Sequence, residues 1–269
     1  MKNTKYVVPN AFTSLSFLLA VWSPLVAAGV WLQPSTDGAN DLSHIALAAN
    51  FILFCVLLDK LDGFAARLFD ASSEFGAQYD SLADLIAFGV APAFLAIFAF
   101  KGYAPEWYDS NRITVFAAIS VYMLCAAMRL AKYNAMDADG NPDYFSGMPS
   151  TLAGAFNALA FILAIKYDMI QTPWVLQTLL VCVAATGVLM VSPLYLSKLK
   201  ARKNKFVNGF QLIAILLCYV FGFSMQFPEL LMACVLGYTF FGFAFGLINK
   251  GVINQQTQDL ANSNQEKLK

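Results

Sequence analysis

The sequence is poor in charged residues and in histidine. Of its 269 residues, 13% are charged, which is about half of the ~25% that is usual in a soluble domain. The 17 basic residues balance the 17 acidic ones, so no bulk positive field favours nucleic acid as a partner. The single histidine, His44, excludes a histidine-rich zinc site. The function must therefore depend on where the few charged side chains lie.

Paired cysteines are also absent. The five cysteines fall singly inside apolar stretches, where this residue behaves as a small buried hydrophobe. They are Cys55, Cys125, Cys182, Cys218 and Cys234. Their spacing offers neither a disulfide framework nor a metal knuckle.

Long apolar stretches, by contrast, are abundant. Hydrophobic residues make up 59% of the chain and the mean hydropathy is +0.60. Apolar windows of about 20 residues, enough for a helix to cross a bilayer, lie at 11–32, 43–68, 75–100, 112–134, 148–166, 173–197, 206–224 and 229–249. We expect an all-α, polytopic membrane helix bundle with about eight transmembrane helices, organised as a six-helix core plus two.

The basic residues between these windows predict the orientation. Three of them, Lys101, Arg112 and Lys166, fall on one side of the expected membrane, and the other fourteen fall on the opposite side. Basic loops stay in the cytoplasm, and an even number of spans returns the chain to its starting side. We therefore expect both termini in the cytoplasm.

One polar stretch, from Asp59 to Asp84, interrupts the second and third windows at their cytoplasmic ends. Asp59 and Asp62 are three positions apart and Asp80 and Asp84 are four apart, so each pair lies on one face of a helix with Cβ atoms roughly 5–6 Å apart. The polar run within 68–75 can reverse the chain direction. Four carboxylates would then face one another across two antiparallel helices.

Such a cluster requires counter-ions, because one ionised side chain at the centre of a bilayer costs at least about 2.5–3.5 kcal/mol. Carboxylate oxygens without thiols or imidazoles favour Mg²⁺ or Mn²⁺. Four aspartates can hold two divalent cations, an arrangement typically used for in-line displacement at phosphorus. The alternative is a polar seam that locks two helices together, although such contacts contribute only ~0.6–2 kcal/mol each.

This stretch resembles the signature of the CDP-alcohol phosphatidyltransferases. Eight positions over 26 residues match it: Asp59, Asp62, Gly63, Ala66, Arg67, Gly76, Asp80 and Asp84. The resemblance implies that the four aspartates bind two divalent cations, Mn²⁺ or Mg²⁺. It also implies that Asp84 is the general base for the acceptor hydroxyl. The alternative is that Asp84 serves only as a metal ligand.

The resemblance further implies a binding site for the donor, CDP-diacylglycerol. This site comprises Asn10, Thr13, Asp62, Gly63, Ala66, Arg67 and Gly76. Asn10 and Thr13 belong to a Pro-Asn-x-x-Thr motif at the start of the first predicted helix, and this motif lies beside the nucleotide in the family. Plain helix capping is the alternative for Asn10. Arg67 would contact the diphosphate or brace the aspartates.

Two later runs resemble the phosphatidylserine synthase branch of the family. They are Arg129-Leu-Ala-Lys132-Tyr-Asn134 and the segment 144–149, Tyr-Phe-Ser-Gly-Met-Pro. Arg129 and Lys132 lie one turn apart, level with the aspartates, so they could bind a carboxylate or a phosphate. The resemblance implies that the carboxylate of L-serine is their partner and that Asn134 also belongs to the acceptor-binding residues. The implied reaction transfers a phosphatidyl group from CDP-diacylglycerol to L-serine and releases CMP. Basic side chains that face lipid headgroups are the alternative.

The resemblance also sets the expected organisation. Residues 1–205 would form the phosphatidyltransferase membrane core, 206–250 two additional transmembrane helices, and 251–269 a disordered cytoplasmic tail. The expected setting is a bacterial inner membrane, with CDP-diacylglycerol, L-serine and membrane lipids as partners. A homodimer is left open, because the family often forms one.

Two other functions stay open at this point. The catalytic motif recognises the donor and not the acceptor. The nearer alternative is therefore phosphatidylglycerophosphate synthase or another family member with a different acceptor. A cation-coupled transporter with intramembrane aspartates is the distant one.

Overall fold

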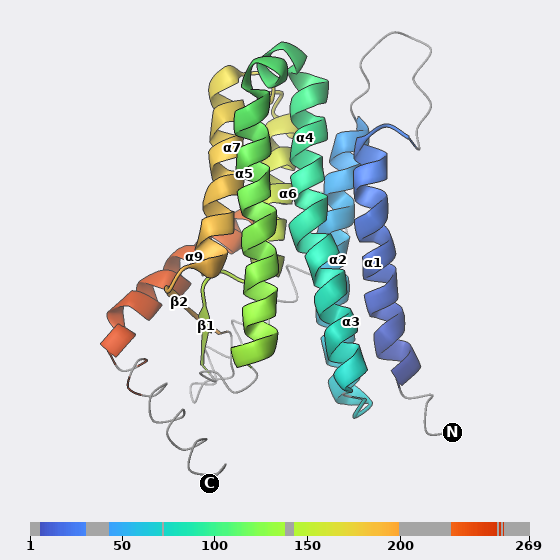
Figure 1. The fold of residues 1–269 in the computed structure, drawn as a ribbon, viewed down its shortest axis with the longest axis vertical. Helices are drawn as coiled ribbons and strands as arrows, with labels where there is room; N and C mark the ends of the chain where they lie inside the picture. Colours follow the sequence, from blue (N-terminus) through green and yellow to red (C-terminus); the bar gives the residue numbers. More distant parts are fainter. Residues whose placement is uncertain are drawn as a thin grey trace.

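The computed structural model describes residues 6–30, 43–71, 73–137, 143–198 and 227–251, together with Ile253 and Gln255. These residues form long helices and one short ribbon (Figure 1). The helices are α1 (Val7–Ala27), α2 (Ser43–Leu68), α3 (Glu74–Asp84), α4 (Ala91–Tyr103), α5 (Pro105–Lys132), α6 (Ser150–Lys166), α7 (Pro173–Val191) and α9 (Pro228–Ile248). Two π-helical segments, η2 (Leu85–Val90) and η3 (Tyr133–Asp137), and two strands, β1 (Tyr144–Ser146) and β2 (Tyr195–Ser197), complete the described elements.

Six helical stretches in the described part of the chain are long and apolar enough to cross a membrane. They are Val7–Ala27, His44–Leu68, Glu74–Tyr103, Pro105–Ala135, Pro173–Val191 and Pro228–Ile248, and Ser150–Lys166 is a shorter apolar helix. The predicted all-α, polytopic membrane bundle is thus confirmed, but the count of eight is not. The window 206–224 lies outside the described residues, as does most of the predicted tail at 251–269.

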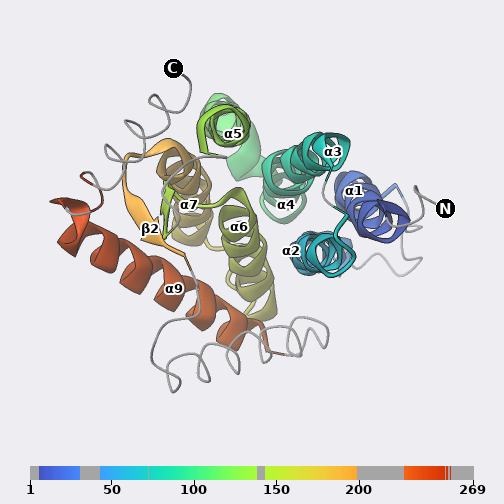
Figure 2. The same cartoon turned by 90° about the horizontal axis from the view of Figure 1, so that it is seen from below.

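The long helices run side by side, while α9 lies obliquely against one flank of the bundle (Figures 1 and 2). Helix α1 packs mainly on α2, and α5 packs mainly on α7. Close approach depends on small residues, as is usual between membrane helices. A Cβ added at Gly154 of α6 would lie 2.9 Å from Cδ1 of Phe88, and one added at Gly187 of α7 would lie 2.8 Å from Cα of Tyr122.

Helix α3 continues into α4 through the π-helical segment η2, which begins directly after Asp84. A π turn widens the helix and disturbs its regular hydrogen bonding. Here the hydroxyl of Tyr122, a fully buried side chain of α5, donates a hydrogen bond of 2.6 Å to the carbonyl oxygen of Phe88. The backbone that follows Asp84 is therefore held from the side by α5.

The end of α2, the beginning of α3, the end of α5 and the two strands all lie toward the lower end of the molecule in Figure 1. The strands pair antiparallel, with Tyr144 opposite Ser197, Phe145 opposite Leu196 and Ser146 opposite Tyr195. All the polar runs that the sequence singled out are thus collected at one end of the bundle.

Candidate functional site

Three of the four predicted metal-binding aspartates form a tight group. One carboxylate oxygen from each of Asp59, Asp62 and Asp80 lies within 4.8 Å of the others. Asp59 and Asp62 come from the last turns of α2, and Asp80 comes from α3. Asp84, the fourth, lies outside this tight group but close enough for the charges of Asp59 and Asp80 to act on it. The predicted meeting of carboxylates across two helices is therefore found, with Asp84 one turn beyond the tightest group.

The donor set of this group fits a hard divalent cation. Its members offer carboxylate oxygens only, the ligands that Mg²⁺ and Mn²⁺ prefer. Asp62 is buried, and Asp59 and Asp80 are half-buried. Three carboxylates so close together repel one another strongly unless a cation lies among them.

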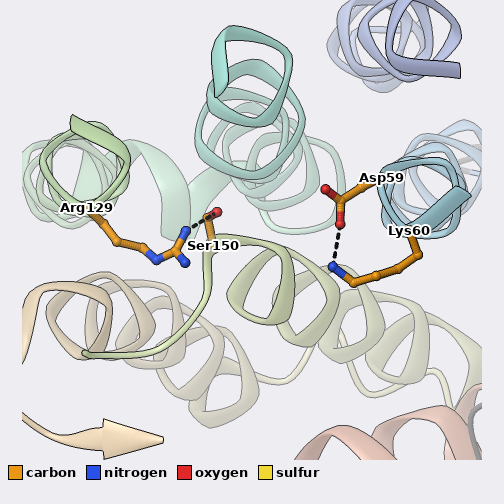
Figure 3. A network of polar contacts seen from close by, with 4 residues as sticks. All are labelled: Asp59, Lys60, Arg129 and Ser150. Carbon is orange, nitrogen blue, oxygen red and sulfur yellow. Dashed lines mark hydrogen bonds and ion pairs between the residues drawn. The ribbon is translucent and has the colours of Figure 1, made fainter. Parts of the chain in front are cut away.

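Lys60 supplies one positive charge beside the group. Its Nζ lies 2.7 Å from Oδ2 of Asp59 (Figure 3). Its charge also acts on Asp62, Asp80 and Asp84. The side chain of Lys60 is 60% exposed and that of Asp59 is 12% exposed, so the lysine reaches the carboxylates from the solvent-accessible side.

Helix α1 contacts the aspartates directly through Thr13. The Thr13 hydroxyl donates a hydrogen bond of 2.8 Å to Oδ2 of Asp62, and both residues are buried. A second link joins α1 to α3, since the Tyr79 hydroxyl donates to Oγ of Ser14 over 3.0 Å. Thr13, predicted to contact the nucleotide, therefore orients a carboxylate of the candidate metal site.

Two other predicted donor-binding residues, Asn10 and Gly76, lie side by side. A Cβ added at Gly76 would lie 3.6 Å from Oδ1 of Asn10 and 3.0 Å from Oγ of Ser73. Ser73 is the N-cap of α3 and accepts a hydrogen bond of 3.0 Å from the Gly76 amide. Helix α1 begins before Asn10, with Tyr6 as its N-cap, so the capping alternative for Asn10 is wrong. The Asn10 side chain is instead directed toward the start of α3.

The remaining donor-binding candidates belong to the last turns of α2. A Cβ added at Gly63 would meet Nη1 of Arg67 at 3.8 Å, so the guanidinium folds back along the helix toward the residue that follows Asp62. The Ala66 carbonyl accepts a hydrogen bond of 2.8 Å from the Ala71 amide in the turn toward α3. Gly63, Ala66 and Arg67 thus lie in the last turns of α2, after Asp62 in the chain.

The three predicted acceptor-binding residues contact three serine hydroxyls. Nη1 of Arg129 donates to Oγ of Ser150 over 2.7 Å, and the charge of Arg129 also acts on Asp84. Nζ of Lys132 donates to Oγ of Ser146 over 3.1 Å. Oδ1 of Asn134 accepts a hydrogen bond of 3.1 Å from Oγ of Ser81, the residue after Asp80. Arg129 and Asn134 therefore interact with residues at or next to the aspartates. Lys132 instead contacts β1 of the two-stranded ribbon that β1 and β2 form.

Figure 3 shows how the charged side chains face each other. Arg129 extends from α5 toward Ser150, while Asp59 and Lys60 extend from α2 on the opposite side. The two basic groups, of Lys60 and Arg129, thus lie on opposite sides of this region, with the Asp59 carboxylate beside Lys60.

Four further residues belong to this region although they are not among the predicted site residues: Lys60, Ser81, Ser146 and Ser150. Ser81 follows Asp80, and Ser146 and Ser150 lie in or next to the run 144–149, so proximity to a motif was the available signal for three of them. Lys60 had no signal beyond its place beside Asp59, because neighbours in a helix sequence do not share a face.

Comparison with known proteins gives consistent matches. The family model described as CDP-alcohol phosphatidyltransferase matches residues 6–170, more than half of the chain. A Helicobacter pylori protein named CDP-diacylglycerol--serine O-phosphatidyltransferase is 31% identical over 236 residues, which cover 88% of this chain and 90% of that protein. A Mycobacterium bovis protein of the same name is 33% identical over 72% of this chain and 62% of its own length. A Bacillus subtilis protein of that name is 39% identical over 41% of this chain and 58% of its own length.

Proposed function

The chain belongs to the CDP-alcohol phosphatidyltransferase family, and we propose that it transfers the phosphatidyl group of CDP-diacylglycerol to L-serine, giving phosphatidylserine and CMP. The observation that carries this proposal is the grouping of Asp59, Asp62 and Asp80 within 4.8 Å, beside an arginine whose charge acts on Asp84. The relatives in Helicobacter, Mycobacterium and Bacillus, which are named as serine enzymes, support serine as the acceptor.

Asp59, Asp62, Asp80 and Asp84 would bind two divalent cations, Mn²⁺ or Mg²⁺. Bound cations would supply charge neutralisation for the diphosphate of the donor and for CMP as the leaving group. The hydrogen bond from Thr13 to Oδ2 of Asp62 would hold that carboxylate in one orientation, as partners of metal ligands typically do.

The donor would bind where α1, α2 and α3 meet. Asn10 and Gly76 lie together there, and the absence of a side chain at Gly76 lets a nucleotide approach the start of α3 closely. Gly63 and Ala66 would leave room for the nucleotide at the end of α2. Arg67 would contact the diphosphate, because a guanidinium forms paired hydrogen bonds with phosphate oxygens.

L-Serine would bind on the side of the aspartates that faces α5, away from the donor. Its carboxylate would lie toward Arg129 and Lys132, with Asn134 nearby. In the reaction, the serine hydroxyl oxygen forms a bond to the phosphorus that carries the diacylglycerol. The bond from that phosphorus to the CMP oxygen breaks, and the hydroxyl proton passes to a carboxylate oxygen of Asp84. Asp84 suits this role because the charges of Asp59, Asp80 and Arg129 all act on it.

We place the protein in a bacterial inner membrane with the site on the cytoplasmic side. Six apolar helices support the membrane location, and bacterial relatives support the organism class. The excess of basic residues at the site end of the helices supports the orientation. A homodimer stays a prediction from the family resemblance.

The test is CMP release from CDP-diacylglycerol by the purified protein with Mn²⁺ or Mg²⁺. L-Serine, glycerol 3-phosphate, inositol phosphate and choline would be compared as acceptors. We expect release with L-serine alone. Release with a different acceptor would retain the phosphatidyl transfer and overturn the assignment of Arg129, Lys132 and Asn134, whereas no release with any acceptor would overturn the proposed reaction and favour a cation-coupled transporter.

A further inference from the structure

Helix α9 contacts strand β2 through residues spaced four apart. The Tyr238 hydroxyl donates a hydrogen bond of 2.9 Å to the carbonyl oxygen of Ser197. A Cβ added at Gly242 would lie 2.6 Å from Cδ1 of Leu196, and one added at Gly246 would overlap the carbonyl of Tyr195. Positions four apart lie on one face of a helix, so one stripe of α9 contacts all three residues of β2 in order.

These contacts leave no space between α9 and the strand backbone. Gly242 and Gly246 are both buried. The ring of Tyr144 in β1 also stacks on Phe245 of α9, with centroids 6.5 Å apart and ring planes inclined by 13°. Both strands of the ribbon, β1 and β2, therefore contact the same helix, α9.

The ribbon in turn contacts the predicted acceptor residues. Ser146, the last residue of β1, pairs with Tyr195 and accepts the hydrogen bond of Lys132. The next residue, Gly147, has a φ of +75°, and its amide donates a hydrogen bond of 2.7 Å to the carbonyl oxygen of Leu194. This turn leads to Ser150, which accepts the hydrogen bond of Arg129.

We propose that Tyr238, Gly242 and Gly246 are positioning residues for the acceptor: they fix β2, β2 fixes β1, and the segment from Ser146 to Ser150 then fixes Lys132 and Arg129. The inference rests on the proposed function, because it assumes that those two basic side chains bind the serine carboxylate. It assigns a role to a helix that lies beyond residues 6–170, the part matched by the family.

A graded series of alanine substitutions on α9 tests this inference. Gly246→Ala places a methyl group against backbone, which cannot rotate away. Gly242→Ala places a methyl group against the end of the Leu196 side chain, which can rotate away. Gly237→Ala is the matched control, since a Cβ at Gly237 would have no atom within 4 Å. All three changes have the same effect on helix propensity.

The measured quantities are KM for L-serine, KM for CDP-diacylglycerol and kcat. We expect KM for L-serine to rise about 10–100-fold in Gly246→Ala, because a displacement of about 1 Å at a substrate-positioning group can cost 10²-fold. Gly242→Ala should raise it by about threefold or less, and Gly237→Ala should leave it unchanged. KM for CDP-diacylglycerol should stay constant throughout, whereas general loss of packing would lower the active fraction and leave both KM values unchanged.

Tyr238→Phe covers the case in which Gly246→Ala does not fold. It removes only the hydroxyl that donates to Ser197, and we expect KM for L-serine to rise about 2–10-fold. Absence of serine-dependent CMP release by the unchanged protein would overturn the proposed function and the inference with it. Serine-dependent release, with equal KM for serine in Tyr238→Phe, Gly246→Ala and Gly237→Ala, would overturn the role of α9 alone.

Discussion

Replacing Lys60 by glutamine should make the carboxylate group bind divalent cations more tightly. The Lys60 ammonium lies 2.7 Å from Oδ2 of Asp59, where it competes with a cation for the same carboxylates and repels any cation that binds. Glutamine keeps most of the side-chain length and removes the charge. The sign of the effect therefore follows from electrostatics alone.

The size of the effect follows from the position of Lys60. Two unit charges about 4 Å apart interact by about 1 kcal/mol in water, so repulsion of a divalent cation is at most about 2 kcal/mol when the side chain is solvated. Lys60 is 60% exposed and can swing away, which reduces this toward the 0.2–1 kcal/mol range of exposed pairs. These limits of about 0.2 and 2 kcal/mol correspond to about 1.4-fold and 30-fold tighter cation binding, since 1.4 kcal/mol is a factor of ten.

The assay is titration of the purified, metal-free protein in lipid nanodiscs with Mn²⁺, followed by electron paramagnetic resonance of the free ion. Lys101→Gln is the matched control, because Lys101 belongs to the last turn of α4, and α4 ends at the opposite end of the bundle (Figure 1). The gain in Lys60→Gln should shrink as salt increases, as screening requires. Unchanged or weaker Mn²⁺ binding in Lys60→Gln would refute the assignment of the cations to these aspartates.

Three other substitutions test separate parts of the site. Asp84→Asn should abolish turnover while the protein still inserts and binds Mn²⁺; turnover that survives this change, or an excess of chelator, would contradict the proposed chemistry. Arg129→Ala should raise KM for L-serine about 10–100-fold, because it removes a charge-assisted hydrogen bond; a change confined to KM for CDP-diacylglycerol would reassign Arg129 to the donor. Thr13→Val should destabilise the protein by about 1–2 kcal/mol in reversible unfolding, whereas Thr178→Val, an exposed hydroxyl bonded within its own helix, should be nearly neutral.

The sequence predicted those features that depend on helical periodicity and local spacing. The positions of Asp59, Asp62 and Asp80 on facing helices follow from spacings of three and four residues and a polar turn between them. Seven of the apolar windows of about 20 residues likewise coincide with the eight described α-helices, because the window 75–100 covers both α3 and α4. Local patterns of this kind act within one or two elements, so they can be read without knowledge of the tertiary structure.

Contacts between distant segments could not be predicted in the same way. The bond from Thr13 to Asp62 joins residues 49 positions apart, and the ribbon pairs two three-residue strands from separate parts of the chain. Strands that short carry no readable alternation. The four-residue spacing of Tyr238, Gly242 and Gly246 is visible in the sequence, but the sequence does not show which strand this stripe contacts.

The division of the site explains why the acceptor was harder to predict than the donor. Carboxylates and donor-binding candidates all belong to α1, α2 and α3, within the segment 6–170 that the family shares. The contacts that would position Lys132 and Arg129 run through β1 to β2 and α9, and these last two elements lie beyond that segment. The Helicobacter relative, named for serine, aligns over 236 residues, more than the family segment contains. If the acceptor is set by this later part, the motif Asp59–Asp84 can identify the donor chemistry while serine selection depends on how α9 holds the ribbon.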